Sequence, residues 1–457
     1  MRFVALAVLI FAVPALMMLL RQNPRYRRYL YFLIGFLPFV ITAWNLDAAL
    51  ISWPAWQGQT KGLILTLLDS LALAVVLSSR RSPWTYPFVG ITIAYLLSAA
   101  LSIAFAANPQ ASFFYVWQLG TMLLVIMAVT TVCQDENGRR IIIAGLVCGI
   151  TLQAGFAISQ KLSGVVQASG TLGHQNLLGM VTHFVLYPSL AMLLATNKSR
   201  LPLIGVAAAM IVIALGASRA TIGLAGVGVV LLIGLSMLRK PSARKTKAAI
   251  AGLLALAIAT PVAWASLEHR FAVKSVEGSA EERVAFERAA KMILDDYPMG
   301  VGANQYVVVA NTQGYSERAG VIWNYGSRAA KVHNAYLLVA AETGYLGLLF
   351  FMIFMFVPIF AALRFAWKNR SDPRGELALG IGVTMIIVSL HCLYEWVFVT
   401  SHVQYMVAIN LGMLGGLMLQ RKAAKRAAIL ERKKMNPDIK PNKIPAMARQ
   451  KRAKATD

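Results

Sequence analysis

A long series of apolar segments constrains this chain's fold more than any other feature of its sequence. Segments of about 20 apolar residues can cross the hydrocarbon of a bilayer as helices. Lipid offers no hydrogen-bond partners, so the backbone must satisfy its own amides and carbonyls, as a helix does. Of the 457 residues, 58% are hydrophobic and only 14% are charged, which excludes an ordinary soluble protein. We predict an all-α, polytopic transmembrane helix bundle.

The bundle is expected to contain about 12–14 spans, because some of the apolar segments are short for a complete crossing. The first segment resembles the apolar part of a signal peptide, but no small-residue cleavage site follows it, so we retain it as a helix. The predicted spans are 3–20, 29–43, 62–79, 86–106, 113–133, 141–160, 176–196, 201–216, 221–238, 248–266, 344–363, 377–395 and 403–420.

The connecting loops alternate in charge and so indicate the orientation. Lys and Arg gather in cytoplasmic loops of membrane proteins, which explains a net charge of +25 without a nucleic-acid partner. The N-terminus is then expected outside. The basic loops are 21–28, 80–84, 134–140, 197–200, 239–247, 364–374 and the tail from Arg421. The outward loops are 44–61, 107–112, 161–175, 217–220, 267–343 and 396–402.

The chain divides into three regions by composition. Residues 1–160 form N-terminal transmembrane helices, and residues 161–420 form a second transmembrane region that includes the large outer loop at 267–343. Residues 421–457 form a basic cytoplasmic tail that we expect to be disordered. Three cysteines without CxxC or metal-ligand spacing indicate neither a disulfide framework nor a zinc site. We expect no cofactor and no metal, because no outward carboxylate cluster resembles a divalent site.

The large outer loop is the one extramembrane segment big enough to build a site. Ser279 and Glu282 fit a capping box, and Pro298 ends the helix that follows, so a helix is predicted over 280–296. By helical geometry Arg283 lies near the apolar face of this helix and Arg288 points away from it. Arg283 is therefore the better candidate for an inward role. The apolar face consists of Phe286, Ala289, Ala290, Ile293 and Tyr297.

Several polar residues lie where lipid surrounds or borders the chain. Arg219, in the outward turn 216–221, either reaches lipid phosphate or grips a substrate phosphate with two parallel donors. His333, at the end of the loop, is either an interfacial hydrogen-bonding residue or a proton acceptor. Asp69 lies within a predicted span and either pairs with a neighbouring helix, titrates or binds substrate. His391 and Glu395, one turn apart near an outer helix end, either pack at the interface or bind the acceptor.

Four motifs together resemble the O-antigen ligase and O-antigen polymerase family of bacterial membrane glycosyltransferases. They are GTLGHQNLLG at 170–179, SRAT at 218–221, RVAFERAAKMILDDYPMGVG at 283–302 and HNAYLLVAAETGYLG at 333–347. The resemblance covers roughly residues 165–365. Phe286 stands where the family often has Trp.

The resemblance implies transfer of a glycan from undecaprenyl pyrophosphate to an acceptor hydroxyl, on the periplasmic face of the inner membrane, without a metal. By motif, Arg219, Arg283 and His333 match residues of the family. Two guanidiniums can stabilise the departing diphosphate, and His333 either takes the acceptor's proton or positions the hydroxyl or the pyrophosphate. These three are the predicted catalytic residues. The predicted substrate-binding residues are Arg288, Asn334, Glu342 and Asn176.

The expected partners are the undecaprenyl-pyrophosphate-linked glycan donor, membrane lipids, and either lipid A-core or a second lipid-linked glycan as acceptor. The first acceptor would make the protein a ligase and the second a polymerase in polysaccharide assembly. The alternative function is a lipid-linked glycan flippase or another polysaccharide transporter. A transporter would expose its substrate-binding charges along a central path open to both sides, and it would not need a His at one membrane face.

Overall fold

The computed structural model describes residues 2–79, 81–195, 199–252 and 276–435, with positions 254, 257, 261, 264 and 268. Helices make up 78% of the described residues and strands 3%, which confirms the predicted all-α bundle. Among the described residues, eight helices are long and apolar enough to cross a membrane. They are α1 (Arg2–Gln22), α5 (Pro109–Cys133), α6 (Glu136–Leu162), α7 (Gln175–Ala195), α9 (Arg219–Arg239), α15 (Ala335–Lys368), α16 (Pro373–His391) and α17 (Ser401–Met435). Shorter apolar helices are α3 (Leu67–Ser78), α4 (Val89–Leu101) and α8 (Leu201–Gly216).

Three predicted spans take another form or lie outside the described residues. The span predicted at 29–43 contains the end of α2 (Pro24–Phe36) and a 3-10 turn, η1 (Leu37–Phe39). With 13 residues, α2 is shorter than the about 20 that a full crossing needs. The span predicted at 62–79 begins as strand β2 (Gly62–Thr66), paired antiparallel with β1 (Asp47–Ser52). The span predicted at 248–266 lies mostly outside the described residues.

The change from strand to helix after β2 has a local cause. Thr66 caps α3 because its hydroxyl accepts from the Asp69 amide at 3.2 Å, while the Asp69 carboxylate accepts from the Thr66 amide at 2.9 Å. The buried Asp69 carboxylate also accepts from the Tyr405 hydroxyl of α17 at 2.9 Å. Asp69 therefore pairs with a neighbouring helix, which is one of the roles considered for it.

In the structure, outward loops contact other outward loops, and basic loops contact other basic loops. Among the outward loops, the Trp56 indole donates to the Asn304 carbonyl at 3.2 Å, and the Gln167 amide donates to the Ala217 carbonyl at 3.1 Å. Among the basic loops, Arg239 donates to the Asn369 carbonyl at 2.9 Å. These contacts agree with the alternation predicted from charge.

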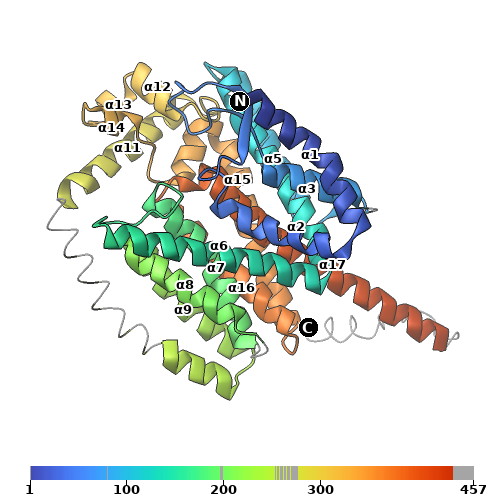
Figure 1. Cartoon of the computed structure of the whole chain (residues 1–457). Coiled ribbons are helices and arrows are strands. Elements are labelled where there is room, and N and C mark those ends of the chain that lie inside the picture. Colours follow the sequence, from blue (N-terminus) through green and yellow to red (C-terminus); the bar gives the residue numbers. More distant parts are fainter. Residues whose placement is uncertain are drawn as a thin grey trace, which may run out of the picture.

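The helices of the large outer loop gather at one end of the bundle, where they appear in yellow and orange (Figure 1). The longest, α11 (Val276–Asp296), ends before Pro298 as predicted but begins at Val276, so Ser279 lies within it and is not its N-cap. Tyr297 is 40% exposed and donates to Gln313, so it does not belong to the buried face predicted for it. The other loop helices are α12 (Tyr306–Thr312), α13 (Tyr315–Arg318) and α14 (Tyr325–Ala329).

A sharp bend at Gly344 joins this loop to the membrane part of α15. Gly344 has φ 69° and ψ −173°, a conformation that other residues avoid. A Cβ at this position would lie 2.4 Å from the Pro298 carbonyl oxygen. The Tyr345 amide donates to that carbonyl at 3.1 Å, and the Gly302 amide donates to the Glu342 carbonyl at 2.8 Å. The turn after α11 thus docks into the bend, which holds the start of α15 close to the loop helices.

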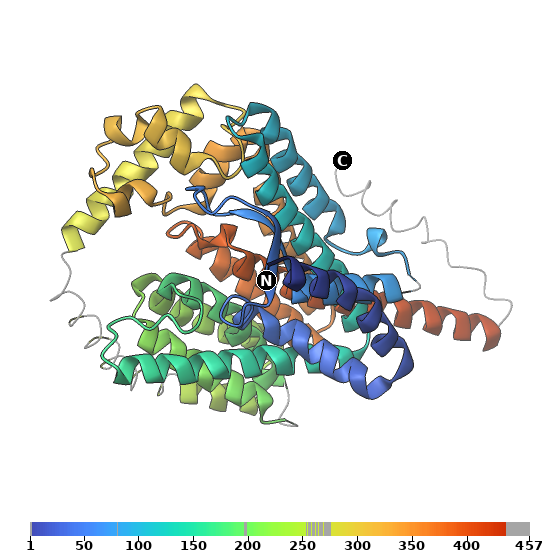
Figure 2. The same cartoon turned by 45° about the horizontal axis from the view of Figure 1, so that its top comes forward.

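Two helices set the environment of the site described below. Helix α7 lies at the centre of the bundle, and each of its residues from 176 to 191 is buried. Helix α9 buries only one row of residues and exposes the rest of its apolar surface, including Val227 and Val230. The turned view shows α9 at the periphery of the bundle below the loop helices (Figure 2). Helix α9 therefore presents a broad face to the surroundings, which for a membrane protein are lipid.

A buried ionic cluster fixes the basic end of the bundle. The Glu376 carboxylate of α16 accepts from Arg239 and Lys245, each at 2.5 Å, and from the Ser236 hydroxyl at 2.9 Å. At the same end, α17 continues as a helix to Met435. Residues 421–435 of the tail expected to be disordered are thus helical, and the remainder of the tail lies outside the described residues.

Candidate functional site

A cavity of about 380 Å³ lies where the turn 216–221, α11 and the segment after α16 meet. Its walls come from parts of the chain that are far apart in sequence, and two of its lining residues are arginines. The lining residues are Asn176, Ser218, Arg219, Ala220, Gly223, Leu224, Arg283, Tyr394 and Glu395. The structure thus places Arg219 and Arg283, both predicted from the sequence, in one cavity.

The Glu395 carboxylate joins the remaining polar groups of this site. Its side chain is only 2% exposed and accepts hydrogen bonds from three separate segments. The Asn176 amide donates to Oε1 at 2.6 Å, and Arg283 donates to the same oxygen at 3.4 Å. His333 Nδ1 lies 3.3 Å from Oε2. His333 is therefore linked through Glu395 to Arg283, and Glu395 itself lines the cavity that Arg219 also lines.

These partners keep the buried carboxylate charged. Burial by itself raises the pKa of Glu395. The hydrogen bond from His333 and the positive charge of Arg283 outweigh burial, so the pKa falls below its ordinary value of 4.5. At neutral pH Glu395 is an anion that accepts hydrogen bonds and donates none.

The position of His333 follows from the start of α15. Asn334 caps this helix, since its Oδ1 accepts from the Tyr336 amide at 3.0 Å and from the Leu337 amide at 3.2 Å. His333 precedes this cap, and its side chain is 21% exposed. Because the Glu395 carboxylate only accepts, Nδ1 carries the proton and the lone pair of Nε2 is available to another group.

Arg219 opens α9 immediately after a tight turn. Ala217 has φ 45°, and the Gln167 side chain holds its carbonyl, so the turn that presents Arg219 is fixed by a second outward loop. The first turn of a helix carries partial positive charge from its amides, which adds to that of the guanidinium. The cavity end of α9 is thus favourable for an anion.

Three residues predicted to bind substrate lie outside this cavity. Arg288 donates to the Ala319 carbonyl at 3.3 Å, within the loop helices. Glu342 is buried and accepts from the Tyr306 amide at 3.1 Å, so it ties α12 to α15. Asn334 acts as the helix cap described above. Of the four residues predicted to bind substrate, Asn176 is the one that lines the cavity.

Glu395 was the residue whose central place the sequence did not indicate. It was paired with His391 by helical spacing, but in the structure the Glu395 carboxylate bonds to Asn176 and Arg283, whereas His391 is buried with its ring 5.4 Å from that of His183. The available signal was charge. The chain has 19 acidic residues against 44 Lys and Arg, and Glu395 is one of the few acidic residues at an outward helix end. In the described part of the chain, no group of three His, Cys, Asp or Glu side chains could hold a metal ion.

Comparison with known families gives a match within the C-terminal part of the bundle. The family model described as O-antigen ligase matches residues 184–352, an interval that runs from the middle of α7 to the membrane part of α15. It contains Arg219, Arg283 and His333, whereas Asn176 and Glu395 lie beyond its two ends. None of the curated proteins matches the chain.

Proposed function

Because this membrane protein carries an O-antigen ligase family domain at 184–352, we propose that it is a glycosyltransferase of O-antigen or exopolysaccharide assembly. In this proposal it transfers a glycan from undecaprenyl pyrophosphate to an acceptor hydroxyl on the periplasmic face of the bacterial inner membrane. The observation that supports it most directly is a cavity lined by Arg219, Arg283 and Glu395, with His333 bonded to the Glu395 carboxylate from its other oxygen.

The cavity suits the departing diphosphate. When the bond between the sugar C1 and the diphosphate oxygen breaks, its electron pair stays on that oxygen, and negative charge grows there. Arg219 and Arg283 line the cavity from two sides and supply fixed donors for this charge. A guanidinium stays protonated throughout the physiological pH range, so this stabilisation needs no proton transfer.

His333 is placed to activate the acceptor. As the acceptor oxygen attacks C1, its proton passes to Nε2, since Nδ1 already donates to Glu395. The Glu395 carboxylate then stabilises the imidazolium that forms and keeps the ring oriented. Glu395 acts through His333 and is a positioning residue in this scheme.

The lipid tail of the donor is expected to lie along α9. Gly223 and Leu224 line the cavity, and the exposed apolar face of α9 continues from them along the bundle. A polyprenyl chain offers a large apolar surface, which this face and the surrounding lipid can cover.

Reconstitution tests the function directly. Purified protein in lipid nanodiscs is given an undecaprenyl-pyrophosphate glycan, with lipid A-core and a second lipid-linked glycan offered separately. A single attachment to lipid A-core identifies a ligase, and a ladder of growing products identifies a polymerase. Absence of transfer to either acceptor, by protein that is folded and inserted, would contradict the proposal.

Variants on one helix give a matched test of the site. Arg283→Gln removes a cation from the cavity, whereas Arg288→Gln removes one from the same helix, where it binds the Ala319 carbonyl. We expect Arg283→Gln, Arg219→Ala and His333→Ala to abolish transfer and Arg288→Gln to retain it. Full activity in Arg219→Ala or His333→Ala would refute the proposed mechanism.

A further inference from the structure

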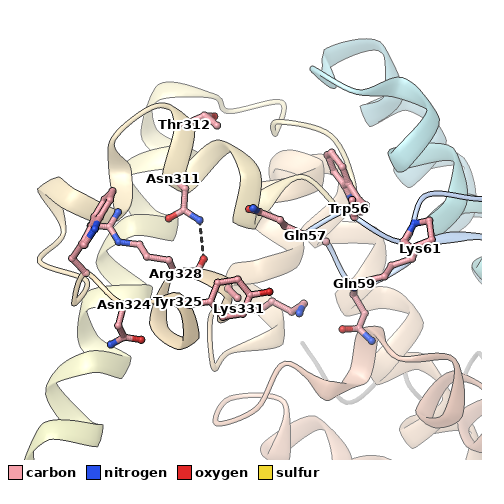
Figure 3. Close-up of a pocket in the computed structure, with 15 residues that line it drawn as sticks. Trp56, Gln57, Gln59, Lys61, Asn311, Thr312, Asn324, Tyr325, Arg328 and Lys331 are labelled. Atoms are coloured by element: carbon pink, nitrogen blue, oxygen red, sulfur yellow. Dashed lines mark hydrogen bonds between the residues drawn. The ribbon is translucent and has the colours of Figure 1, made fainter.

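A second and larger cavity, of about 830 Å³, lies between the β1–β2 connection and the loop helices (Figure 3). Its floor comes from the segment 54–61, and its walls come from the end of α12 and from the segment 323–331 that contains α14. The labelled side chains in Figure 3 reach toward it from both segments. The functional scheme above makes no use of this cavity.

The lining is polar, aromatic and basic. Its charged residues are Lys61, Arg328 and Lys331, and no carboxylate stands among the residues that line it in the described chain. Lys331 is half-buried, and burial lowers the pKa of its ammonium to about 8. The uncharged polar and aromatic lining residues are Gln57, Gln59, Asn311, Asn324, Trp56, Trp323 and Tyr325.

The aromatic residues of the α14 side are unusually exposed. Tyr325 is 90% exposed and Trp323 is 80% exposed, although large aromatic side chains normally bury most of their surface. The Arg328 guanidinium stacks over the Trp323 ring at 4.2 Å. Aromatic faces beside amides and cations suit a sugar, since a pyranose ring has an apolar C–H face for stacking and hydroxyls at its edge for the amides.

The opposite wall is held in place before any ligand binds. The side chain of Asn304 accepts from the Thr60 amide at 3.1 Å and donates to the Thr60 carbonyl at 2.8 Å, which pins the β1–β2 connection to the outer loop. Asn311 Nδ2 donates to the Arg328 carbonyl at 2.7 Å, as drawn in Figure 3. Asn311 and Arg328 line the cavity, and each also has a buried atom without a hydrogen-bond partner in the described structure, Asn311 Oδ1 and Arg328 Nε.

This second cavity adjoins the catalytic centre along the chain and in space. Lys331, which lines it, precedes His333 by two residues, and its ammonium lies 4.5 Å from the centre of the Trp396 ring. Trp396 directly follows Glu395. A glycan held in the cavity would therefore reach the proposed site of bond formation within a few sugar units.

We propose that this cavity is a binding subsite for an acidic saccharide of one of the two reacting glycans. The inference rests on the proposed function for the identity of those glycans, but the subsite itself is testable without turnover. The cations and the absence of lining carboxylates argue for an acidic sugar, and the exposed aromatic rings argue for a sugar over a free anion.

Binding to the full chain in nanodiscs, measured by isothermal titration calorimetry, tests the proposal. The probes are tetragalacturonate as an acidic oligosaccharide, maltotetraose as a neutral one, and inorganic pyrophosphate. We expect tetragalacturonate to bind most tightly at this cavity, and Tyr325→Ala and Arg328→Gln each to weaken it by about tenfold or more. Arg318→Gln is the matched control, because Arg318 also stacks on an aromatic ring, Tyr315, but does not line the cavity.

The outcomes separate this proposal from its rivals. Equal affinity for maltotetraose would overturn the acidic specificity, and unchanged binding in folded Tyr325→Ala and Arg328→Gln would overturn the site. If Tyr325→Ala leaves tetragalacturonate binding unchanged and lowers only the insertion of the full chain into nanodiscs, the aromatic residues are a membrane anchor and the proposal fails. Arg219→Ala should lose transfer yet keep tetragalacturonate binding, so failure of the proposed function and of the subsite are distinguishable.

Turnover identifies which glycan uses the subsite. With acidic donor and acceptor glycans, Arg328→Gln should raise KM for one of them and leave kcat and the other KM unchanged. A rise for the donor assigns the subsite to the donor glycan, and a rise for the acceptor assigns it to the acceptor. A change in kcat alone would overturn the assignment, because it would place Arg328 in the chemical step.

Discussion

Replacing Glu395 by Gln tests how the site orients its base. The change keeps the size of the side chain, and the Gln carbonyl can still accept from Asn176, so the buried contact at 2.6 Å is retained. The change removes the negative charge that faces His333 at 3.3 Å and Arg283 at 3.4 Å. The Gln amide can present its NH₂ group to His333, in which case Nδ1 must accept and Nε2 carries the proton. The imidazole then has the wrong tautomer to receive a proton from the acceptor.

The size of the effect follows from the contacts. A hydrogen bond to a charged group contributes about 1.5–3 kcal/mol. If stabilisation of this size is lost from the transition state alone, kcat falls by about ten- to a hundredfold. The Arg283 side chain is 38% exposed, so water replaces much of its lost ion pair, and we assign it little of the effect. The expected result is a reduced kcat with the KM for donor nearly unchanged.

Single-turnover transfer in nanodiscs, with substrates saturating, measures this kcat. Glu376→Gln is the matched control: it removes another buried carboxylate paired with cations, at the opposite end of α16. We expect Glu376→Gln to lower the melting temperature and to retain the kcat of each folded molecule. If Glu395→Gln transfers glycan as fast as the unaltered protein, or if both variants lose activity only in proportion to unfolding, the reasoning about His333 is wrong.

Three further predictions concern stability and the lipid path. The pKa of Glu395 is lowered in the folded protein, so its stabilising contribution is present at neutral pH and is lost as the pH falls through that lowered value. The melting-temperature difference between the unaltered protein and Glu395→Gln should therefore shrink once the pH drops below 4.5, and a constant difference would contradict this. Gly223→Leu fills part of the cavity without a clash, because a Cβ there meets nothing within 4 Å, and it should weaken donor binding in a titration with lipid-linked glycan. Gly226→Leu, equally free of clashes but outside the cavity, should leave donor binding unchanged, and equal effects would refute the lipid path along α9. Gly344→Ala should destabilise the protein by about 1–3 kcal/mol in thermal unfolding, from backbone strain and overlap with the facing loop, while Gly155→Ala in α6 should not; equal melting temperatures would refute the role of the bend.

The sequence predicted features that depend on local pattern. The lengths of the apolar segments predict the helices, and the Lys and Arg content of the loops predicts which loops lie on the same side. Pro298 marks the end of α11. Helical geometry placed Arg283 nearer than Arg288 to the apolar face of α11 and so favoured it for an inward role. In the structure Arg283 lines the cavity, whereas Arg288 donates to a loop carbonyl.

The features that the sequence missed depend on distant partners. Residues 62–66 are as apolar as a helical segment, and only pairing with β1 and the cap at Thr66 makes them a strand. Glu342 lies in a family motif next to the bend, yet its partner is an amide of α12. Glu395 became central only because three segments far from it in sequence converge on its carboxylate.

The Glu395 carboxylate also has a consequence for how the protein is made. Its hydrogen bond with Asn176 spans 219 positions, and the arginine and histidine that share it are synthesised in between. A nascent chain that has emerged only as far as α15 contains Arg283 and His333 but lacks the carboxylate that both of them contact. Such a chain cannot assemble this cluster, so the ribosome must complete nearly the whole polypeptide before the proposed site exists.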